Sequence, residues 1–94
     1  MGLRFEWDPK KARINWARHG VSFDEAGTAF QDPLSRTIED PLHSEQEDRF
    51  VLLGLSHGNR LLVVVHTERG DRIRIISARP ATKRERRRYE ENAD

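Results

Sequence analysis

The chain has 94 residues, which suffices for one small domain and is too short for two. Hydrophobic residues and charged residues each make up 35% of it, so a small core must lie under a heavily charged surface. Without cysteine, the protein can form no disulfide, thiolate metal site or cysteine nucleophile. No apolar run approaches the roughly 20 residues that span a bilayer, and the first residues lack the order of a signal peptide. We therefore expect one domain over residues 1–94 that works in the cytoplasm and away from membranes.

The net charge of +1 conceals three segments of different sign. The formal charge is +3 over residues 1–21, −7 over residues 22–48 and +5 over residues 49–94. Fourteen of the seventeen basic residues are arginine, whose planar guanidinium matches phosphate oxygens better than the lysine ammonium does. This pattern favours a polyanionic partner. The alternative is a solvated basic surface that pairs with the acidic segment of the same chain.

The first predicted helix spans about residues 9–19. Asp8 is a suitable N-cap, Pro9 suits the first helical position, and Gly20 ends the stretch. The apolar residues of this helix are expected to form one buried stripe: Ala12, Ile14, Trp16 and Ala17.

A second helix begins at the capping box of residues 22–25 and runs to about Gln31, where an Asp-Pro pair breaks it. Residues 34–39 are predicted to form a short strand. A polar acidic loop then continues through Asp48.

Three stronger strand patterns follow, over residues 49–57, 60–68 and 71–79. The breaks between them are Gly58-Asn59 and Arg69-Gly70, and each is the length of a tight hairpin turn. Together with the strand over residues 34–39, these patterns predict a four-stranded antiparallel meander. The expected fold class is α+β, with two N-terminal helices packed on the sheet and a C-terminal helix after it.

Alternation assigns the side chains to two faces of the sheet if both turns have two residues. The face expected to carry the helices holds Val51, Leu53, Leu55, Leu62, Val64, Ile73 and Ile75. The other face holds Phe50, Leu52, Gly54, Val63, Val65, Thr67, Arg72, Arg74 and Ile76. Because this second face combines apolar residues with two arginines, we expect it to bind a ligand.

The third helix opens at the capping box of residues 82–85, after Pro80 ends the last strand. Its apolar residues are only Ala81, Tyr89 and Ala93. We therefore expect this helix to dock loosely on the sheet or to be held by a partner.

The chemistry of the chain rests on side chains other than cysteine. The four histidines show no metal-ligand spacing, and phosphate loops, nucleophile elbows and dinucleotide fingerprints are missing from the sequence, so we expect neither metal nor cofactor. His66 fits a core-edge position on the helix side of the sheet. A basic sheet face near His, Glu and Tyr suits metal-free RNA cleavage, in which a ribose 2′-OH attacks the adjacent phosphate while the protein positions the strand and neutralises charge.

Two blocks of the sequence resemble the BrnT family of bacterial ribonuclease toxins from type II toxin–antitoxin pairs. The first block comprises Phe5-Glu6-Trp7-Asp8, Lys11, Asn15, His19-Gly20-Val21, Phe23-Asp24-Glu25-Ala26, Phe30 and Asp32-Pro33. The second comprises Arg72-Ile73-Arg74-Ile75-Ile76-Ser77-Ala78-Arg79, Ala81, Glu85-Arg86 and Tyr89. The resemblance covers about residues 4–90. It implies a RelE-like fold, RNA cleavage that inhibits translation, and neutralisation by a cognate BrnA-type antitoxin that binds DNA, with a dimer as one form of the toxin–antitoxin complex.

The resemblance also implies catalytic roles. Arg72, Arg74 and Arg79 lie in the second block and are the expected phosphate and transition-state cations. For Arg79 the structural alternative is that it binds acidic residues of the second helix. Local chemistry alone adds His66 and Glu68 as general-base candidates.

A second set of residues is expected to contact RNA. Arg86 and Tyr89 match the family and are candidates for substrate positioning or proton transfer, and Tyr89 is counted among the expected catalytic residues. Lys11 also matches the family and is either a phosphate contact or plain surface. Lys83 and Arg87 complete the predicted RNA-binding set.

A non-enzymatic module is the alternative to an enzyme. It would bind RNA or DNA, or clamp an acidic partner on its basic face. Turnover separates the two hypotheses, because only an enzyme produces new RNA ends at sub-stoichiometric protein.

Overall fold

The computed structural model of the chain describes residues 2–40 and 48–92. In chain order its elements are β1 (Arg4–Glu6), α1 (Pro9–His19), α2 (Phe23–Thr28), the 3-10 turn η1 (Ala29–Gln31), β2 (Arg36–Glu39), β3 (Arg49–Leu55), β4 (Leu61–Arg69), β5 (Arg72–Pro80) and α3 (Lys83–Asn92). The α+β class and the three predicted helices are confirmed. Most of the predicted acidic loop, residues 41–47, lies outside the described residues.

The sheet has five strands in the order β1-β5-β4-β3-β2, not the four that the sequence predicted. Strands β2 to β5 form the expected antiparallel meander. Strand β1 adds to β5 in parallel, with Phe5 opposite Ile73, so the sheet is mixed. The prediction missed β1 because three residues carry too little alternation to identify a strand, and its pairing partner lies near the other end of the chain.

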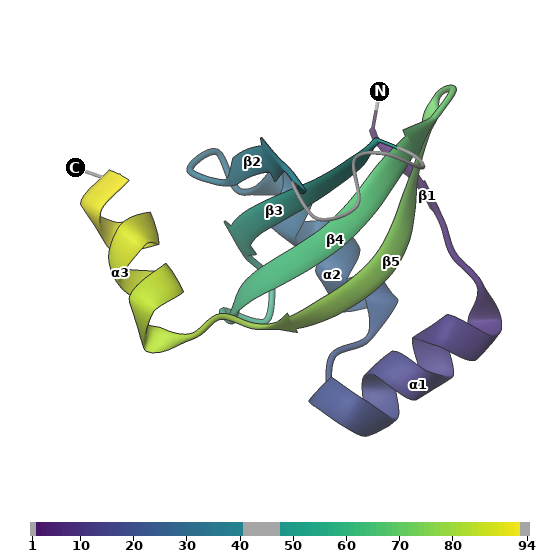
Figure 1. The fold of residues 1–94 in the computed structure, drawn as a ribbon, viewed down its shortest axis with the longest axis horizontal. Helices are drawn as coiled ribbons and strands as arrows, with labels where there is room; N and C mark the ends of the chain where they lie inside the picture. The colour runs from purple at the N-terminus through teal and green to yellow at the C-terminus, as the bar shows by residue number, and fades with distance from the viewer. Residues whose placement is uncertain (1, 41–47, 93–94) are drawn as a thin grey trace.

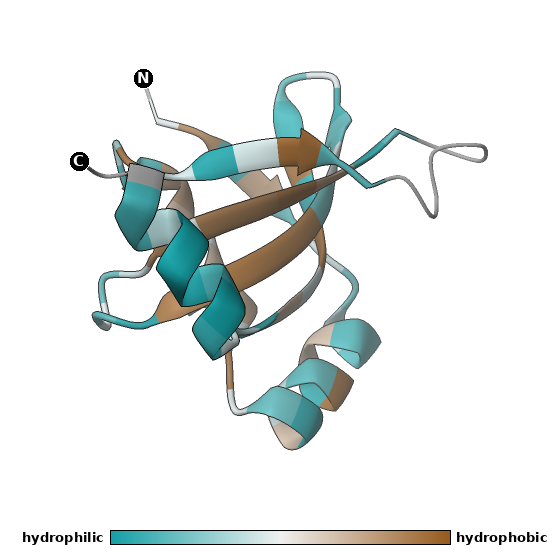
Figure 2. Ribbon diagram, turned by 60° about the vertical axis from the view of Figure 1, so that its left-hand side comes forward, coloured by the Kyte–Doolittle hydropathy of each residue, from teal (hydrophilic) through white to brown (hydrophobic). Residues whose placement is uncertain are grey.

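The helices lie on both faces of the sheet. Figure 1 shows α2 behind the sheet, α1 beside β5 and α3 at the opposite side, near β2 and β3. Figure 2 shows α3 passing in front of the apolar strands. We call the face covered by α2 the inner face and the face toward α3 the outer face.

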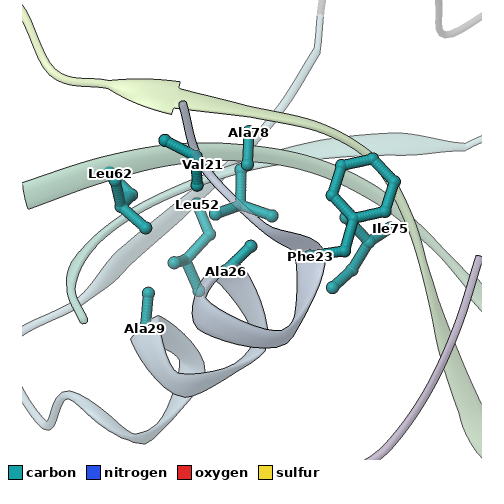
Figure 3. Packing of buried hydrophobic residues seen from close by; sticks show 9 residues of the cluster. Val21, Phe23, Ala26, Ala29, Leu52, Leu62, Ile75 and Ala78 are labelled. Carbon is teal, nitrogen blue, oxygen red and sulfur yellow. The ribbon is translucent and has the colours of Figure 1, made fainter. Parts of the chain in front are cut away.

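The hydrophobic core lies between α2 and the inner face of the sheet (Figure 3). Its buried members are Val21, Phe23, Ala26, Ala29, Leu52, Leu62, Val64, Ile75 and Ala78. Phe5, Trp7, Ala12 and Phe30 pack against this cluster from its edges. Burial of a large side chain such as Phe23 contributes about 2 kcal/mol, so this small cluster supplies most of the stabilisation available to the fold.

The predicted faces of β3 are wrong, because the connection from β3 to β4 is longer than two residues. The Ser56 N–H donates to the Arg60 carbonyl at 2.8 Å, and Asn59 adopts a left-handed backbone with φ of 62°. Leu55 consequently pairs with Leu61. Relative to a two-residue turn, this pairing is displaced by one residue and exchanges the faces of the whole strand. Leu52 and Gly54 therefore belong to the inner face, and Val51, Leu53 and Leu55 to the outer face.

In the hairpin of β4 and β5, the side chains of the first half of β5 lie on their predicted faces. The turn lies at residues 70–71, one residue later than predicted, and Glu68 pairs with Ile73. The residues of β4 from His66 to Arg69 therefore pair with β5 residues two positions later than predicted. A displacement by two residues leaves side chains on the same face, so Ile75 remains on the inner face and Arg74 on the outer face.

The predicted buried stripe of α1 is wrong. Ile14 and Trp16 are 56% and 60% exposed, and Ala17 is exposed as well. Only Ala12 of that stripe packs against the core, whereas the buried residue of the helix is Asn15. The reason is that α1 lies against the margin of the sheet at β5 rather than over its centre (Figure 1).

The ends of the helices follow their local signals. Asp8 accepts a hydrogen bond from the Lys10 N–H, and Ser22 accepts one from the Glu25 N–H. Gly20 takes the left-handed conformation that ends α1, with φ of 66°. No helix in the described part of the chain is long and apolar enough to cross a bilayer.

Candidate functional site

Four arginines gather on three neighbouring strands at one end of the sheet. Arg72 of β5 is in register with Arg4 of β1 on one side and with Arg69 of β4 on the other. Arg74 follows two residues later on the same face. Residues directly opposite each other in a sheet lie on one face, so these side chains leave the sheet together. We call Arg4, Arg69, Arg72 and Arg74 the arginine cluster.

Carboxylates pair with three members of the arginine cluster. Arg74 Nη1 donates to Glu6 Oε2 at 2.8 Å, and Arg69 Nη1 lies 3.9 Å from the same oxygen. A separate ion pair joins Arg4 and Asp71 at 3.6 Å, with both side chains largely exposed. Four arginines against two carboxylates leave the cluster with a net charge of +2.

Arg72 differs from its neighbours in having its guanidinium uncommitted. Within residues 2–40 and 48–92, its side chain makes no hydrogen bond or ion pair. Arg74, by contrast, is held by Glu6 and is only 33% exposed. One exposed cation beside one oriented cation is an arrangement that can take a phosphate from two sides.

A β-bulge brings Arg79 to the same face as the arginine cluster. His66 pairs with Ile75, but Val65 pairs with Ser77, so Ile76 is an extra residue in β5. Uninterrupted alternation from Arg74 would have turned Arg79 toward the inner face. Because of the bulge it shares the outer face, about 15 Å along the strand from Arg74 at a rise of about 3.3 Å per residue.

Arg79 is bound to the third helix. Its Nη1 and Nη2 donate to Glu85 Oε1 and Oε2 at 2.8 and 2.9 Å. Glu85 also accepts from the Thr82 N–H at 2.8 Å and so completes the predicted capping box. Hydrogen bonding to Arg79 lowers the pKa of Glu85 to about 2, although burial opposes the shift. Arg79 thus binds a carboxylate of its own chain, as the structural alternative predicted, but the partner is Glu85 of α3 and not an acidic residue of the second helix.

Tyr89 is the second polar anchor of α3. Its hydroxyl donates to Asp32 Oδ2 at 2.6 Å, and the same carboxylate accepts from the Leu34 and Leu55 N–H groups. Burial and the contact with Asp32 raise the pKa of Tyr89 to about 12. The phenol therefore stays protonated near neutral pH and is committed to holding the helix.

An apolar groove of about 200 Å³ lies between α3 and the outer face. Its walls are Arg36, Ile38, Val51, Leu53, Val63, Glu85 and Arg88. The groove exists because α3 is held to the body mainly by the Arg79–Glu85 and Tyr89–Asp32 contacts and has few apolar residues to fill the space.

The two general-base candidates lie apart from the arginine cluster. His66 is 3% exposed on the inner face, between the rings of Phe30 and Phe50 at 4.7 and 5.9 Å. Desolvation lowers its pKa, which keeps the ring neutral. Glu68 follows on the same side of β4 by alternation. This location favours the core-edge interpretation of His66 over a direct role with RNA bound to the outer face.

The predicted RNA-binding residues occupy two separate helices. Lys11 is exposed on α1, and Lys83, Arg86 and Arg87 are exposed on α3. The structure therefore groups Arg72 with Arg74, connects Arg79 with α3, and places Lys11 in a hollow with Ile76 and Ser77 of β5.

Sequence reasoning missed Arg4, Glu6 and Arg69. The only signal for them was the Phe-Glu-Trp run, which matched the family, but nothing in it showed that β1 would lie beside β5. In the described residues, no three His, Asp or Glu side chains converge where they could hold a metal ion.

The fold and the site define a small α+β protein with a cluster of arginines on one face of a five-stranded mixed sheet. The chain belongs to the family of the ribonuclease toxin BrnT of type II toxin–antitoxin systems, whose family model matches residues 7–85. This confirms the resemblance expected from the sequence. The match includes Arg72, Arg74 and Arg79, whereas Arg4, Glu6 and Tyr89 lie outside it.

Among solved structures, the ribonuclease toxin BrnT of Brucella abortus is similar to this chain, with a TM-score of 0.69 and 24% sequence identity. The similarity covers 87% of this chain and 100% of that one, and it shows that the two share a fold. A search of curated proteins finds no match.

Proposed function

We propose that this protein is a metal-independent endoribonuclease toxin that acts in the cytoplasm, inhibits translation by cleaving RNA, and is neutralised by a cognate DNA-binding antitoxin. The observation that carries the proposal is the arginine cluster on the outer face, together with the family of ribonuclease toxins to which the chain belongs. A ribose 2′-OH is the nucleophile, and the products are a 2′,3′-cyclic phosphate and a 5′-hydroxyl end.

In this mechanism the scissile phosphate binds between Arg72 and Arg74. Glu6 holds the Arg74 guanidinium in one orientation before RNA arrives, so no reorganisation is needed as charge develops on the phosphorane. Arg72 is exposed and adds a second positive charge. A single strand continuing along the outer face of β5 would next meet Arg79 and the basic surface of α3, where Lys83, Arg86 and Arg87 can contact further phosphates.

A non-enzymatic RNA-binding module is the second candidate. It is favoured by the position of His66 and Glu68, which leaves the arginine cluster without either predicted general base. Turnover distinguishes this candidate from the enzyme.

We expect Arg72→Ala and Arg74→Ala each to slow RNA cleavage about a hundredfold, which is the typical loss on removing one preoriented charge from a transition state. The free energy of unfolding should fall by about 1 kcal/mol or less, because these contacts are partly exposed. Single-turnover cleavage and thermal melting are measured on the same variants. Arg36→Ala is the matched control, since Arg36 is an exposed strand arginine outside the arginine cluster. Variants that cleave like wild type would move the active site elsewhere.

Cleavage should proceed undiminished in EDTA, because arginine supplies the charge that a metal ion supplies in other nucleases. RNA with 2′-deoxyribose at the cleaved nucleotide should resist. Product ends are identified by mass spectrometry. Activity that is lost on chelation and restored by magnesium would reject this mechanism.

A further inference from the structure

The first helix exposes an aromatic side chain that the fold does not use. Trp16 is 60% exposed, although a helix packed against a sheet would ordinarily bury its largest apolar residue. The hydrogen bonds of Asn15 to the backbone of Val21 and Ala78 fix the rotation of α1, and this rotation leaves Trp16 outward.

Trp16 forms one wall of a shallow hollow of about 440 Å³. The lining is Trp7, Ala12, Arg13, Trp16, Ser22, Phe23 and Asp24. Trp7 packs edge-to-face on Phe23 at 5.8 Å, so the inner wall is a fixed aromatic surface. Arg13 and Trp16 lie about one turn apart on α1 and form the opposite wall of the hollow. The hollow thus offers flat apolar surfaces beside a guanidinium.

The helix that carries Trp16 is basic, although the hollow itself is lined by one cation, Arg13, and one carboxylate, Asp24. Within Pro9–His19 there are four lysines and arginines and no acidic residue. The other large exposed apolar residue of α1, Ile14, lies in a separate hollow with Lys11, Arg18 and His19. A protein partner needs a contiguous apolar patch, and lysine is depleted from the centres of such interfaces. Isolated apolar side chains separated by cations fit single-stranded nucleic acid better, because its bases stack while its phosphates pair with the cations.

We propose that this hollow binds an unstacked base of single-stranded RNA, with the base against Trp16 and a neighbouring phosphate on Arg13. The hollow lies between α1 and α2, on the side of the sheet opposite the arginine cluster, so it would hold a part of the strand remote from the cleaved phosphate, and in this respect the proposal rests on the proposed function. The exposed carboxylate of Asp24 repels phosphate from the hollow and can accept from the N–H groups of a base. The occupant is therefore a base carrying ring or amino N–H donors.

The test compares Trp16→Ala, Trp16→Phe and the control Ile14→Ala, which removes an equally exposed apolar side chain from the other side of α1. The probe is a short single-stranded RNA made non-cleavable by 2′-O-methylation, with an RNA duplex of the same length as the second ligand. Dissociation constants are measured by fluorescence anisotropy, and kcat and KM by cleavage of the unmodified strand. We expect Trp16→Ala to weaken single-strand binding about tenfold or more and to raise KM, while leaving kcat and duplex binding unchanged. Trp16→Phe should recover most of the affinity, and Ile14→Ala should behave as wild type.

Single-strand affinity that is unchanged in Trp16→Ala would overturn this inference, as would equal weakening of single-strand and duplex binding. The two proposals fail separately. If the wild type cleaves RNA and Trp16→Ala binds single-stranded RNA with the affinity of the wild type, the proposed enzyme is supported and the base site is contradicted. If Trp16→Ala weakens binding of the single strand but the wild type cleaves no RNA, the base site is supported and the proposed enzyme is contradicted.

Discussion

Asn15 shows how one polar residue can take the place of an apolar contact. It is 5% exposed, and its side-chain amide donates to the carbonyls of Val21 and Ala78 while its carbonyl accepts from the Ala78 N–H at 3.0 Å. These three bonds join α1, the segment before α2 and β5. They satisfy backbone groups next to the β-bulge that would otherwise be buried without partners.

Asn15→Ala should lower the free energy of unfolding by about 3 kcal/mol, because three backbone groups lose their partners. Urea denaturation monitored by tryptophan fluorescence measures the change. Ile14→Ala, on the adjacent exposed position, should alter it by about 0.5 kcal/mol or less. A loss below about 1 kcal/mol for Asn15→Ala would mean that water replaces the amide and that the network matters little.

At the scale of elements, α3 is held to the body by polar contacts rather than by an apolar face. Arg79 meets Glu85 near the start of the helix, and Tyr89 meets Asp32 farther along it. The prediction of a helix with little to bury agrees with this arrangement, but the two anchors could not be foreseen, since Asp32 is far from Tyr89 in the sequence. Docking of α3 should therefore respond to acid in a way that an apolar interface does not.

Glu85 should titrate with a pKa of about 2 in the folded protein, as measured by NMR of its side-chain carboxyl. Arg79→Ala should raise this pKa toward the ordinary value of about 4.5, because the bidentate contact is the largest cause of the shift. Since the folded pKa is depressed, the contact stabilises α3 docking fully above about pH 4.5 and is lost as the pH falls toward 2. A wild-type pKa near 4.5 would show that Arg79 and Glu85 are not joined in solution.

The bulge in β5 is the element that assembles the basic face. Without the extra residue at Ile76, Arg79 would point toward the core side instead of sharing a face with Arg74. The same irregularity lets both Ile75 and Ala78 reach the core although they lie three residues apart. One inserted residue thus serves the packing and the candidate site together.

For the whole molecule, the segregation of charge raised the question of whether the arginines merely neutralise the acidic segment. In the described residues, Glu25 of that segment pairs with Arg60 at 2.9 Å, and Asp32 receives Tyr89. Arg74 and Arg79 pair instead with Glu6 and Glu85, which lie outside residues 22–48. Within the described residues, the acidic segment therefore does not neutralise Arg74 or Arg79.

Induced expression of the chain should arrest bacterial growth and protein synthesis, and co-expression of a small antitoxin encoded beside it should relieve the arrest. The reason is that a ribonuclease with an accessible basic face acts on cellular RNA unless a partner covers that face. Growth curves and radiolabelled amino-acid incorporation are the measurements, with Arg74→Ala as the inactive control. Unchanged growth in several hosts would contradict the toxin assignment.

The local sequence determined the helices, the four strands of the antiparallel meander and the family. Caps such as Asp8-Pro9 and the 82–85 box act within one turn of chain, and Arg72 to Arg79 form one contiguous block, so neither depends on distant residues. These features could be predicted because the groups that decide them are neighbours in the chain.

Only the tertiary structure decided which side chains meet. The faces of β3 depend on the loop between β3 and β4, which is longer than the predicted two-residue turn. The partners of Arg74 and Tyr89 come from the opposite half of the chain. Strand register is set by long-range pairing and by burial of one face, so an error of one residue in a turn moves every side chain of the strand to the other face. The sequence could therefore supply candidate residues for the site, whereas their geometry required the β1–β5 pairing and the bulge at Ile76.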